Sequence, residues 1–346
     1  MAKKKRQQHY SGIGGQAVLE GVMMRNKSLM AVAVRKPDGE IEVAVDEYHG
    51  IGERTIWTKI PLVRGILSFI DSLITGMKAL NFSSSFYEDE EEEGGRPKKE
   101  KTPEQQARED SAVTVITMVI SVILALAIFL ALPLFLTGLL EGFIRNDAVM
   151  AILEGLIRLG IFLLYMVLIT LMPDIKRLYR YHGAEHKCIN CIERGAPLTV
   201  DNVLDSTRFH KRCGSSFIIL ILIISIILFF FIRVDNYAER LILRLLLIPV
   251  IAGISFEFLR YAGRHSNLFV DMISAPGVWL QHLTTKEPDA EIVEVAISSV
   301  EAVFDWREYL KRAFGYTDQE IDQALEEAAL SGRDFEQGRA YRDDAV

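Results

Sequence analysis

Four long apolar runs dominate the hydrophobic pattern of the chain, and each has roughly the length of a membrane-spanning helix. They cover approximately residues 112–139, 149–171, 217–232 and 241–259. A helix needs about 20 apolar residues to cross the hydrocarbon core, because each residue adds about 1.5 Å. Helices buried in a soluble core are the alternative, but such cores rarely supply four runs this poor in charge. The pattern therefore predicts a mainly α-helical, polytopic membrane protein with about four transmembrane helices.

Lysine and arginine gather in some of the connecting segments and predict the orientation of the helices. The connections between the first and second runs and between the third and fourth are short and carry little positive charge. The segment 174–216 and the N-terminus are instead rich in Lys and Arg. Because basic loops stay on the cytoplasmic side, we expect both termini and the central loop in the cytoplasm.

A small folded region precedes the first apolar run. Residues 30–45 alternate apolar and polar side chains on both sides of Pro37-Asp38-Gly39, which predicts a β-hairpin with Asp-Gly at its turn. Residues 60–81 have helical spacing, with charged side chains set seven positions apart on one face. We expect this helix to lie on the membrane or against the bundle, with a re-entrant fifth segment as the alternative.

Polar segments separate these elements and end the chain. The residues before the first run form a charged stretch that predicts a disordered linker. After the fourth run, residues 274–304 predict a turn followed by an amphipathic helix. From about Thr317 the chain is polar and acidic, with a short helix at most.

These patterns divide the chain into seven segments. They are a cytoplasmic region with the hairpin and the interfacial helix (1–84), the linker (85–110), transmembrane helices one and two (111–172), a cytoplasmic loop rich in His and Cys (173–215), transmembrane helices three and four (216–262), a cytoplasmic C-terminal segment (263–316) and the polar tail (317–346).

Composition supports the membrane assignment and narrows the choice of partners. Half of the residues are hydrophobic and the mean hydropathy is +0.19, yet 25% are charged, so polar and apolar residues are segregated along the chain. The net charge of −7 is not that of a nucleic-acid-binding protein. No apolar stretch of a signal peptide follows the basic N-terminus, so the first long run must direct insertion. The expected partner is the lipid bilayer, and the sequence does not indicate an oligomeric state.

The central loop contains a motif with metal-binding spacing. His182 and His186 are four residues apart, so on a helix both imidazoles share a face and reach one ion. Glu185 lies between them in the order His-x-x-Glu-His, where it could act as a general base toward a metal-bound water. Gly183 weakens the helical interpretation, and a solvated basic loop is the alternative.

All three cysteines of the chain lie near this motif, together with one more histidine. An odd number of closely spaced cysteines fits a reduced compartment with thiols free for metal or redox chemistry. Imidazole and thiolate ligands together favour zinc over magnesium or calcium. The groups that could complete the site are Cys188, Cys191, His210 and Cys213.

Three kinds of site remain open from the residues alone. A catalytic site would use His182, His186, one later ligand and a water, with Glu185 as base. A structural site would close a tetrahedron with two His and two Cys and activate nothing. A redox pair, Cys188 with Cys191, would need no metal, but no thioredoxin-like pattern surrounds it.

Four charged residues outside the loop also have a predicted role, either in the site or at the membrane. Glu20 and Arg25 flank an unusual glycine-rich and apolar start, which predicts a tight turn before the first strand or, alternatively, a ligand or charge partner for the central loop. Glu257 lies near the end of the fourth run, where it could pair with Arg260, face the site or reach the membrane surface. Arg244, near the other end, is expected to extend its guanidinium to the interface.

Five sequence blocks together resemble the YqhQ-like family of bacterial membrane proteins, from about residue 12 to residue 300. The resemblance implies a bacterial plasma membrane protein and a metal-dependent enzyme activity whose substrate is not established. Two positions depart from the family pattern: Cys188 stands where threonine is expected, which ranks it below the other cysteines, and Lys211 stands where proline is expected, which affects loop geometry. The blocks are GGQAVLEGVMMR, YHGAEHK, FHKRCGSS, LLLIPVIAGISFEFLR and APGVWLQHLTTKEP. The resemblance carries the metal hypothesis onto His182, Glu185, His186, Cys191, His210 and Cys213, and adds weight to Glu20, Arg25 and Glu257.

The leading functional hypothesis is a multi-pass membrane metalloprotein that binds zinc and acts as a hydrolase at the cytoplasmic membrane face. Its substrate would be a membrane-proximal peptide or a lipid-linked molecule. The alternative is a non-enzymatic membrane scaffold or assembly factor whose metal only braces the central loop. A transporter is disfavoured, because few polar groups lie within the apolar runs and no inverted repeat stands out.

Overall fold

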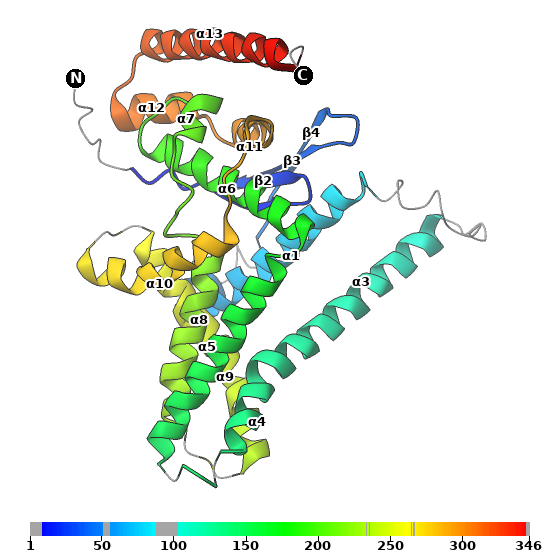
Figure 1. Cartoon of the computed structure of the whole chain (residues 1–346), viewed down its shortest axis with the longest axis vertical. Coiled ribbons are helices and arrows are strands. Elements are labelled where there is room, and N and C mark those ends of the chain that lie inside the picture. Colours follow the sequence, from blue (N-terminus) through cyan, green and yellow to red (C-terminus); the bar gives the residue numbers. More distant parts are fainter. Residues whose placement is uncertain are drawn as a thin grey trace.

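The computed structural model describes most of the chain and has two parts: an apolar helical bundle and a mixed region of helices and sheet at one end of it (Figure 1). The described residues are 9–50, 56–87, 103–140, 142–144, 146–232, 234, 236–263, 265 and 267–343. Most of the expected disordered linker, residues 88–102, lies outside the described residues. The segments that start at residue 9 and end at residue 343 lie at the same end of the molecule, which we call the sheet end (Figure 1).

The N-terminal region is a four-stranded antiparallel meander in the order β1-β2-β3-β4. The predicted hairpin is confirmed as β3 and β4, with Gly39 in the turn at a positive φ of 87°. The segment expected to be only a turn before the first strand instead forms a second hairpin, β1 and β2, which turns at Leu19-Glu20. The strands are β1 (Gly14–Val18), β2 (Gly21–Asn26), β3 (Leu29–Arg35) and β4 (Ile41–Glu47).

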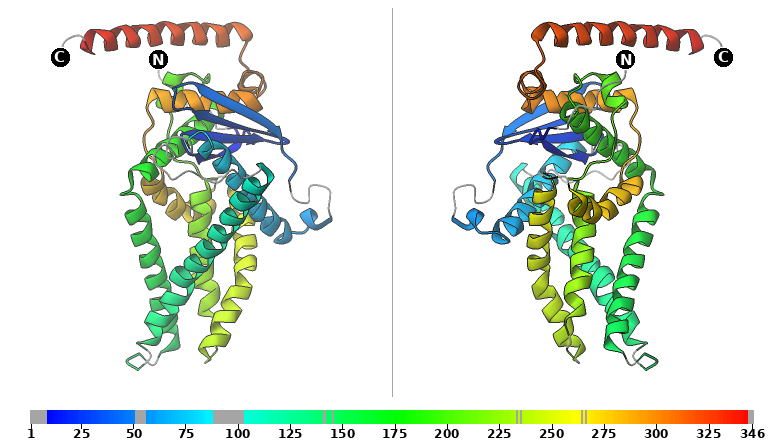
Figure 2. Two further views of the ribbon diagram at one scale, coloured as in Figure 1. Left: turned by 90° about the vertical axis from the view of Figure 1, so that its right-hand side faces the viewer. Right: turned by 90° about the vertical axis from the view of Figure 1, so that its left-hand side faces the viewer.

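Both faces of the sheet are covered, which explains why successive residues of β2 and β3 are buried. On one face Val22, Met24, Ala31 and Ala33 pack with residues of α6 and α11. On the other face Val18, Met23, Val32 and Val34 pack against Ala79 of α1. The covering helices are α1 (Val63–Ser84), α6 (Pro173–Glu193) and α11 (Ala290–Val303). The predicted helix at 60–81 is therefore confirmed as α1, and Figure 2 shows it between the sheet and the bundle.

Among the described residues, three helices are long and apolar enough to span a membrane: Val115–Gly138, Ala148–Ile169 and Tyr237–Ala262. They belong to α3 (Pro103–Leu126) with its continuation through η2 (Ala127–Ala131) and α4 (Leu132–Gly138), to α5 (Asp147–Ile169) and to α9 (Tyr237–Ala262). The third predicted run forms α8 (Gly214–Phe230), an apolar helix of only 17 residues, or roughly 26 Å. The chain is thus a membrane protein with three candidate spans and one shorter apolar helix.

A buried charge cluster joins two of the spans, and it contradicts the expectation for Arg244. The side chain of Arg244 does not reach an interface: it is 3% exposed and donates to Glu154 of α5 over 2.7 Å. Arg158 donates to the same carboxylate over 2.6 Å. A guanidinium cannot extend to water when a carboxylate and close packing hold it inside the bundle. We call Glu154, Arg158 and Arg244 the membrane charge cluster.

A proline in the first span leaves one backbone carbonyl without its helical donor, and one of these arginines donates to that carbonyl instead. Pro133 has no N–H, so it cannot donate to the carbonyl of Phe129 four residues earlier. Arg158 donates its Nε–H to that carbonyl over 3.2 Å. The π-helical turn η2 lies at the same place, as expected where the helical hydrogen-bond ladder is interrupted.

The regular elements of the C-terminal part, from α10 onward, are all helices, and two predictions for this part were wrong. The predicted turn at the start of 274–304 lies inside α10 (Leu268–Thr284), which continues through Pro276. The polar tail forms α13 (Asp318–Asp343), a much longer helix than expected. Its start is a capping box that the sequence already contained: Thr317 Oγ1 accepts from the Glu320 N–H, and Glu320 accepts from the Thr317 N–H. The remaining short helices are η1 (Ile56–Lys59), α7 (Val200–Leu204) and α12 (Trp306–Phe314).

Candidate metal centre

The histidine motif lies on a continuous helix, as its spacing predicted. α6 places His182 and His186 one turn apart on the same face. Gly183 between them is required by packing, because a Cβ there would collide with the backbone carbonyl oxygen of Lys286. The Lys286 N–H donates to the Tyr179 carbonyl of α6 over 2.8 Å, which holds this close approach. The glycine therefore serves a helix contact and does not interrupt the helix.

Cys213 comes to this face from the start of α8. It is the N-cap of that helix, and its Sγ lies 3.1 Å from His182 Nε2. The ligand atoms of His182, His186 and Cys213 all lie within 4.8 Å of one another. His186 is 1% exposed and Cys213 is 6% exposed, whereas the side chain of His182 keeps 17% exposure and gives the cluster its contact with the surface.

Two backbone carbonyls orient both imidazoles. His182 Nδ1 lies 2.8 Å from the carbonyl oxygen of Thr284, and His186 Nδ1 lies 2.6 Å from that of Arg208. A carbonyl can only accept, so Nδ1 of each ring carries a proton and donates it. This leaves Nε2 of each ring to face Cys213. The same arrangement fixes the tautomer and orientation of histidines that bind metal ions.

The charges of the three groups depend on one another. Although burial opposes ionisation, the imidazoles of His182 and His186 hold the pKa of Cys213 well below its usual value. Burial likewise lowers the pKa of His182, but the neighbouring Cys213 thiolate and Glu185 raise it overall to about 9. The pKa of His186 is also raised, against burial, mainly by Cys213. The three groups therefore favour a thiolate at Cys213 and positive charge beside it.

Glu185 is beside this cluster and is held by the N-terminal sheet. Its Oε2 lies 3.9 Å from His182 Nε2, and the side chain is 7% exposed. Burial raises its pKa, which favours a carboxylate that can take up a proton. The Gly15 N–H of β1 is hydrogen-bonded to it, and a Cβ at Gly15 would lie 3.0 Å from its Cγ. The first strand therefore forms one wall of the site.

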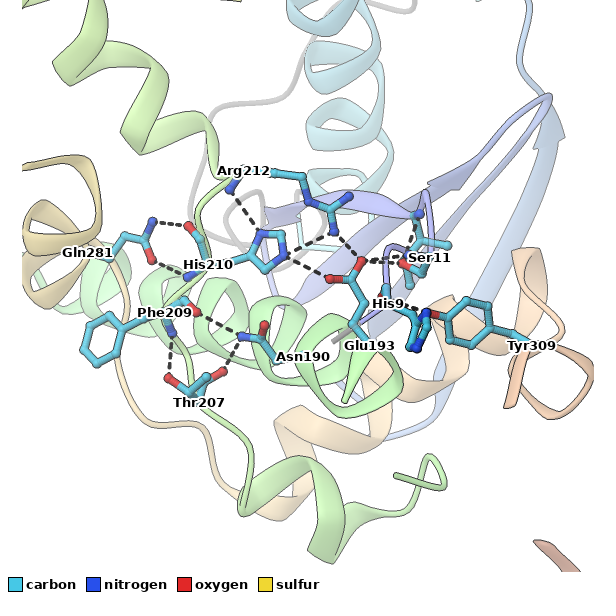
Figure 3. Close-up of polar contacts among 11 residues, drawn as sticks. His9, Ser11, Asn190, Glu193, Thr207, Phe209, His210, Arg212, Gln281 and Tyr309 are labelled. Atoms are coloured by element: carbon cyan, nitrogen blue, oxygen red, sulfur yellow. Dashed lines mark hydrogen bonds and ion pairs between the residues drawn. The ribbon is translucent and has the colours of Figure 1, made fainter. Parts of the chain in front are cut away.

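His210 lies close to the cluster but belongs to a separate polar network (Figure 3). Its ring centroid is 5.7 Å from that of His186. His210 Nε2 lies 3.8 Å from Glu193, which also forms an ion pair with Arg212 and accepts from the Ser11 hydroxyl over 2.8 Å. Although burial opposes it, hydrogen bonding from His210 and the charge of Arg212 lower the pKa of Glu193 to about 2. The network ties the N-terminal segment to the end of α6.

Cys191 does not reach the other predicted ligands. Its Sγ donates to the carbonyl of Pro197 over 3.4 Å, within the core around α6 and α11. Cys188 is also buried in that core. Burial raises the pKa of both thiols, that of Cys191 to about 12, so both are protonated at neutral pH. Inert, buried thiols do not fit a redox pair.

The acidic residues predicted outside the loop differ in whether they contact the central helix α6. Glu20, in the β1–β2 turn at φ 49°, pairs with Arg177 of α6 and accepts from Tyr181 over 3.1 Å, so it is a charge partner of the central helix. Glu257 forms two hydrogen bonds with Arg64 of α1, at 2.6 and 2.5 Å, instead of pairing with Arg260.

Arg25 has no contact with the central helix among its described interactions. It lies 3.5 Å from Asp71 of α1 and stacks on the ring of Tyr48 at 3.9 Å. Its role in this structure is to join the sheet to α1, so it does not contribute to the metal cluster.

Several residues of the site act through backbone atoms, which sequence reasoning did not find. Thr284 and Arg208 contribute carbonyl oxygens and Gly15 contributes an N–H, and none of these atoms depends on the side-chain type. The signal that could have found two of them was their position in the blocks GGQAVLEGVMMR and APGVWLQHLTTKEP.

The fold and the cluster together define a membrane protein that holds two imidazoles and a thiolate where its apolar bundle meets the sheet region. The chain belongs to the family described as "Protein of unknown function (DUF1385)", which it matches over residues 60–306. It is 38% identical over 292 residues to "Uncharacterized protein YqhQ" of Bacillus subtilis (strain 168), an alignment that covers 83% of this chain and 90% of that protein. This confirms the resemblance found in the sequence. No solved structure matches the chain significantly.

Proposed function

We propose that this protein is a membrane-bound, zinc-dependent hydrolase whose site is formed by His182, His186 and Cys213 with Glu185 as general base. One observation carries the proposal: three donor atoms suited to zinc converge within 4.8 Å, beside a buried carboxylate. Zinc is bound in proteins by imidazole nitrogen at about 2.0 Å and by thiolate at about 2.3 Å, usually with four ligands. Three side-chain ligands leave a position for water, which is the pattern of catalytic zinc sites.

Each side chain then has a role that follows from its surroundings. His182 and His186 present Nε2 because carbonyls hold their Nδ1–H groups. Cys213 supplies the thiolate that these imidazoles favour. When bound, zinc lowers the pKa of a coordinated water to about 7. Glu185 accepts the proton, since burial raises the pKa of its carboxyl group.

A structural metal site, the alternative for a scaffold or assembly factor, is less well supported. It needs a closed shell of four protein ligands. Cys191 donates to a backbone carbonyl elsewhere in the core, and His210 is engaged by Glu193 and Arg212. Among the described residues, the cluster therefore offers three ligands.

We further propose four transmembrane helices in a bacterial plasma membrane, with α8 as the short fourth span. The sheet, α6 and the C-terminal helices would then be cytoplasmic. The support is the concentration of Lys and Arg in the segment between α5 and α8, which favours the cytoplasmic side. The site would act on a membrane-proximal peptide or a lipid-linked molecule, because its Cys213 is the N-cap of the apolar helix α8.

Two matched cysteine variants test the metal site. Cys213→Ser removes a proposed ligand, and Cys191→Ser makes the same change at another buried cysteine. In detergent-purified protein, inductively coupled plasma mass spectrometry should find about one zinc per chain in the wild type and in Cys191→Ser, and almost none in Cys213→Ser. Equal zinc in both variants would contradict the ligand set.

Glu185→Gln separates catalysis from binding. It should retain zinc, because the carboxylate is not a proposed ligand, and it should lose peptide or ester hydrolysis measured with a panel of amphiphilic fluorogenic substrates. Loss of zinc would identify Glu185 as a ligand. Unchanged turnover would exclude it as the base.

A further inference from the structure

The helix α10 has two sides with different surroundings. Its inner side contacts both the loop before α8 and the candidate metal centre: Gln281 donates to the His210 carbonyl over 2.6 Å, and the Thr284 carbonyl orients His182. Its outer side carries large apolar side chains, of which Leu268 is 85% exposed, Met272 is 65% exposed and Trp279 is 59% exposed. These three lie four and seven residues apart, so they form one face. Water-exposed apolar faces of this kind are uncommon in soluble proteins.

The position of α10 relates this outer face to the membrane. Figure 1 shows α10 running across the sheet end of the bundle, crosswise to the long axes of α5 and α8. Its inner residue Leu280 is fully buried with Phe162 and Met166 of α5 and Ile219 of α8. The helix is therefore packed on the ends of two apolar helices and lies at the level where the bundle begins.

Exposed apolar side chains also occupy the end of the neighbouring span. At the end of α5 nearest to α10, Leu168 is 53% exposed, and Leu171 and Met172 just beyond it are 63% and 51% exposed. Asp271, the acid in the first turn of α10, is paired with Lys211 at 2.7 Å. An exposed apolar face on a helix that packs against two apolar helices, with a tryptophan on the face and its first-turn acid paired with a lysine, fits the boundary between lipid and water.

We propose that α10 is a membrane-surface helix, with Leu268, Met272 and Trp279 inserted into the lipid bilayer at the sheet end of the bundle. The partner is the bilayer itself. The inner side of the same helix holds His182 through the Thr284 carbonyl, so the depth of α10 sets the depth of the metal centre. If the proposed hydrolase function holds, on which this step rests, the substrate class is an amphiphile whose reactive polar bond lies at the membrane surface.

Spin labels measure the depth of α10 directly. The three native cysteines are buried, so Met272→Cys and Trp279→Cys can be labelled selectively in the full chain. The protein is reconstituted in vesicles of phosphatidylethanolamine and phosphatidylglycerol, and collisions of the label with oxygen and with a water-soluble nickel chelate are compared. Leu164→Cys on the exposed side of α5 is the lipid reference, and Glu291→Cys on the exposed side of α11 is the water reference.

The expected result is that both α10 labels favour oxygen over the nickel chelate, with depths between those of the two references. Nickel collisions equal to those at Glu291→Cys would place α10 in water and overturn the proposal. Protection from both reagents would show that protein covers the face, for example a second copy of this chain, and would also overturn it.

A second measurement uses the protein without labels. Lipids brominated near the headgroup quench a tryptophan that lies in the interface, and the quenched fraction of the fluorescence should fall when Trp279→Phe replaces the wild type. Trp306 is 1% exposed and serves as an internal unquenched residue. Identical quenching in Trp279→Phe and wild type would overturn the proposal.

Zinc content distinguishes this proposal from the proposed function. Labelled Met272→Cys should keep wild-type zinc, because its side chain points away from the metal centre. Bilayer contact without zinc would support α10 as a surface helix and reject the hydrolase. Zinc without bilayer contact would overturn α10 as a surface helix and leave the proposed zinc site standing.

Discussion

The candidate metal centre and the membrane charge cluster are both small groups of buried ionisable side chains, but they differ in how their polar groups are partnered. In the membrane charge cluster, Glu154 accepts from Arg158 and Arg244, and the Phe129 carbonyl accepts from Arg158 as well. Both guanidinium groups thus have a carboxylate partner within the bundle, and Arg244 Nε is a buried donor without a hydrogen-bond partner among the described residues. In the metal centre, two imidazole nitrogens and a sulfur point at one another, and all three can act as lone-pair donors.

This difference indicates what each cluster does. Opposite charges that pair with one another inside a bundle hold helices together, and they cost stability when one partner is removed. Lone-pair donors that converge are satisfied only by protons or by a cation. Although burial opposes it, the Cys213 sulfur raises the pKa of both histidines, which indicates that a positive charge is favoured at this position. The first cluster is therefore structural, and the second is suited to bind an ion.

The largest expected effect tests the structural role of the membrane charge cluster. Glu154→Ala leaves two arginines without their carboxylate, which should destabilise the protein by about 3–5 kcal/mol. Arg158→Met is the matched control: it keeps the Glu154–Arg244 pair and should cost much less. Unfolding in mixed detergent micelles measures both. Equal losses would show that the pairing is not what holds these helices.

Zinc should stabilise only through the metal centre. At a free zinc concentration of about 100 times Kd, the wild type should gain about 2.7 kcal/mol against unfolding. The double variant His182→Ala, His186→Ala should gain nothing, and Glu154→Ala should gain as much as the wild type although it starts from lower stability. Thermal unfolding with and without zinc measures this, and a zinc response in the double variant would contradict the assignment.

Gly183→Ala tests whether the packing of α6 against the Lys286 backbone supports the metal centre. The added Cβ would collide with a carbonyl oxygen, so we expect a loss of about 1–3 kcal/mol. Zinc affinity should fall too, because the displaced segment includes Thr284, whose carbonyl holds His182. Gly160→Ala is the control, since nothing lies within 4 Å of the corresponding Cβ. Unchanged zinc affinity in Gly183→Ala would separate packing from binding.

The effect of pH is the smallest when it is taken per pH unit. His182 is protonated below its pKa of about 9 in the ion-free protein, and zinc requires it neutral. Zinc affinity should therefore rise with pH, by about tenfold per unit for this one proton, and level off as pH passes 9. Titration with a fluorescent zinc indicator between pH 6.5 and 9 would measure it. A flat profile would show that His182 is neutral before zinc binds.

The sign of the stability change follows from the same shift in the ion-free protein. The folded-state pKa of His182 is raised above its ordinary value, so its contribution to stability is complete at low pH and is lost as pH rises toward 9. Added zinc should reverse this trend at high pH. The two pH responses thus distinguish the ion-free and zinc-bound forms of the same site.

Local sequence patterns predicted the parts of this protein that depend on neighbouring residues. The apolar runs predicted membrane helices, the Asp38-Gly39 turn predicted a hairpin, and the spacing of His182 and His186 predicted a shared helix face. Each of these signals is local: the length of an apolar run, the residue types at a turn, or the spacing of residues along a helix. The missed strands β1 and β2 show the limit, since β2 is covered on both faces and lacks a simple alternation.

The tertiary structure alone decided which of the candidate groups meet. Cys213 comes to His182 from 31 residues away and Thr284 from 102 residues away, whereas Cys191, on the same helix as both histidines, points into the core. Arg244 is likewise placed by its partner on α5 and not by its distance from the end of a span. Sequence determined the helices and the chemical types of the ligands, because these depend on local periodicity and residue identity. The selection among those ligands came from the packing of distant elements, because only packing brings their atoms within bonding distance.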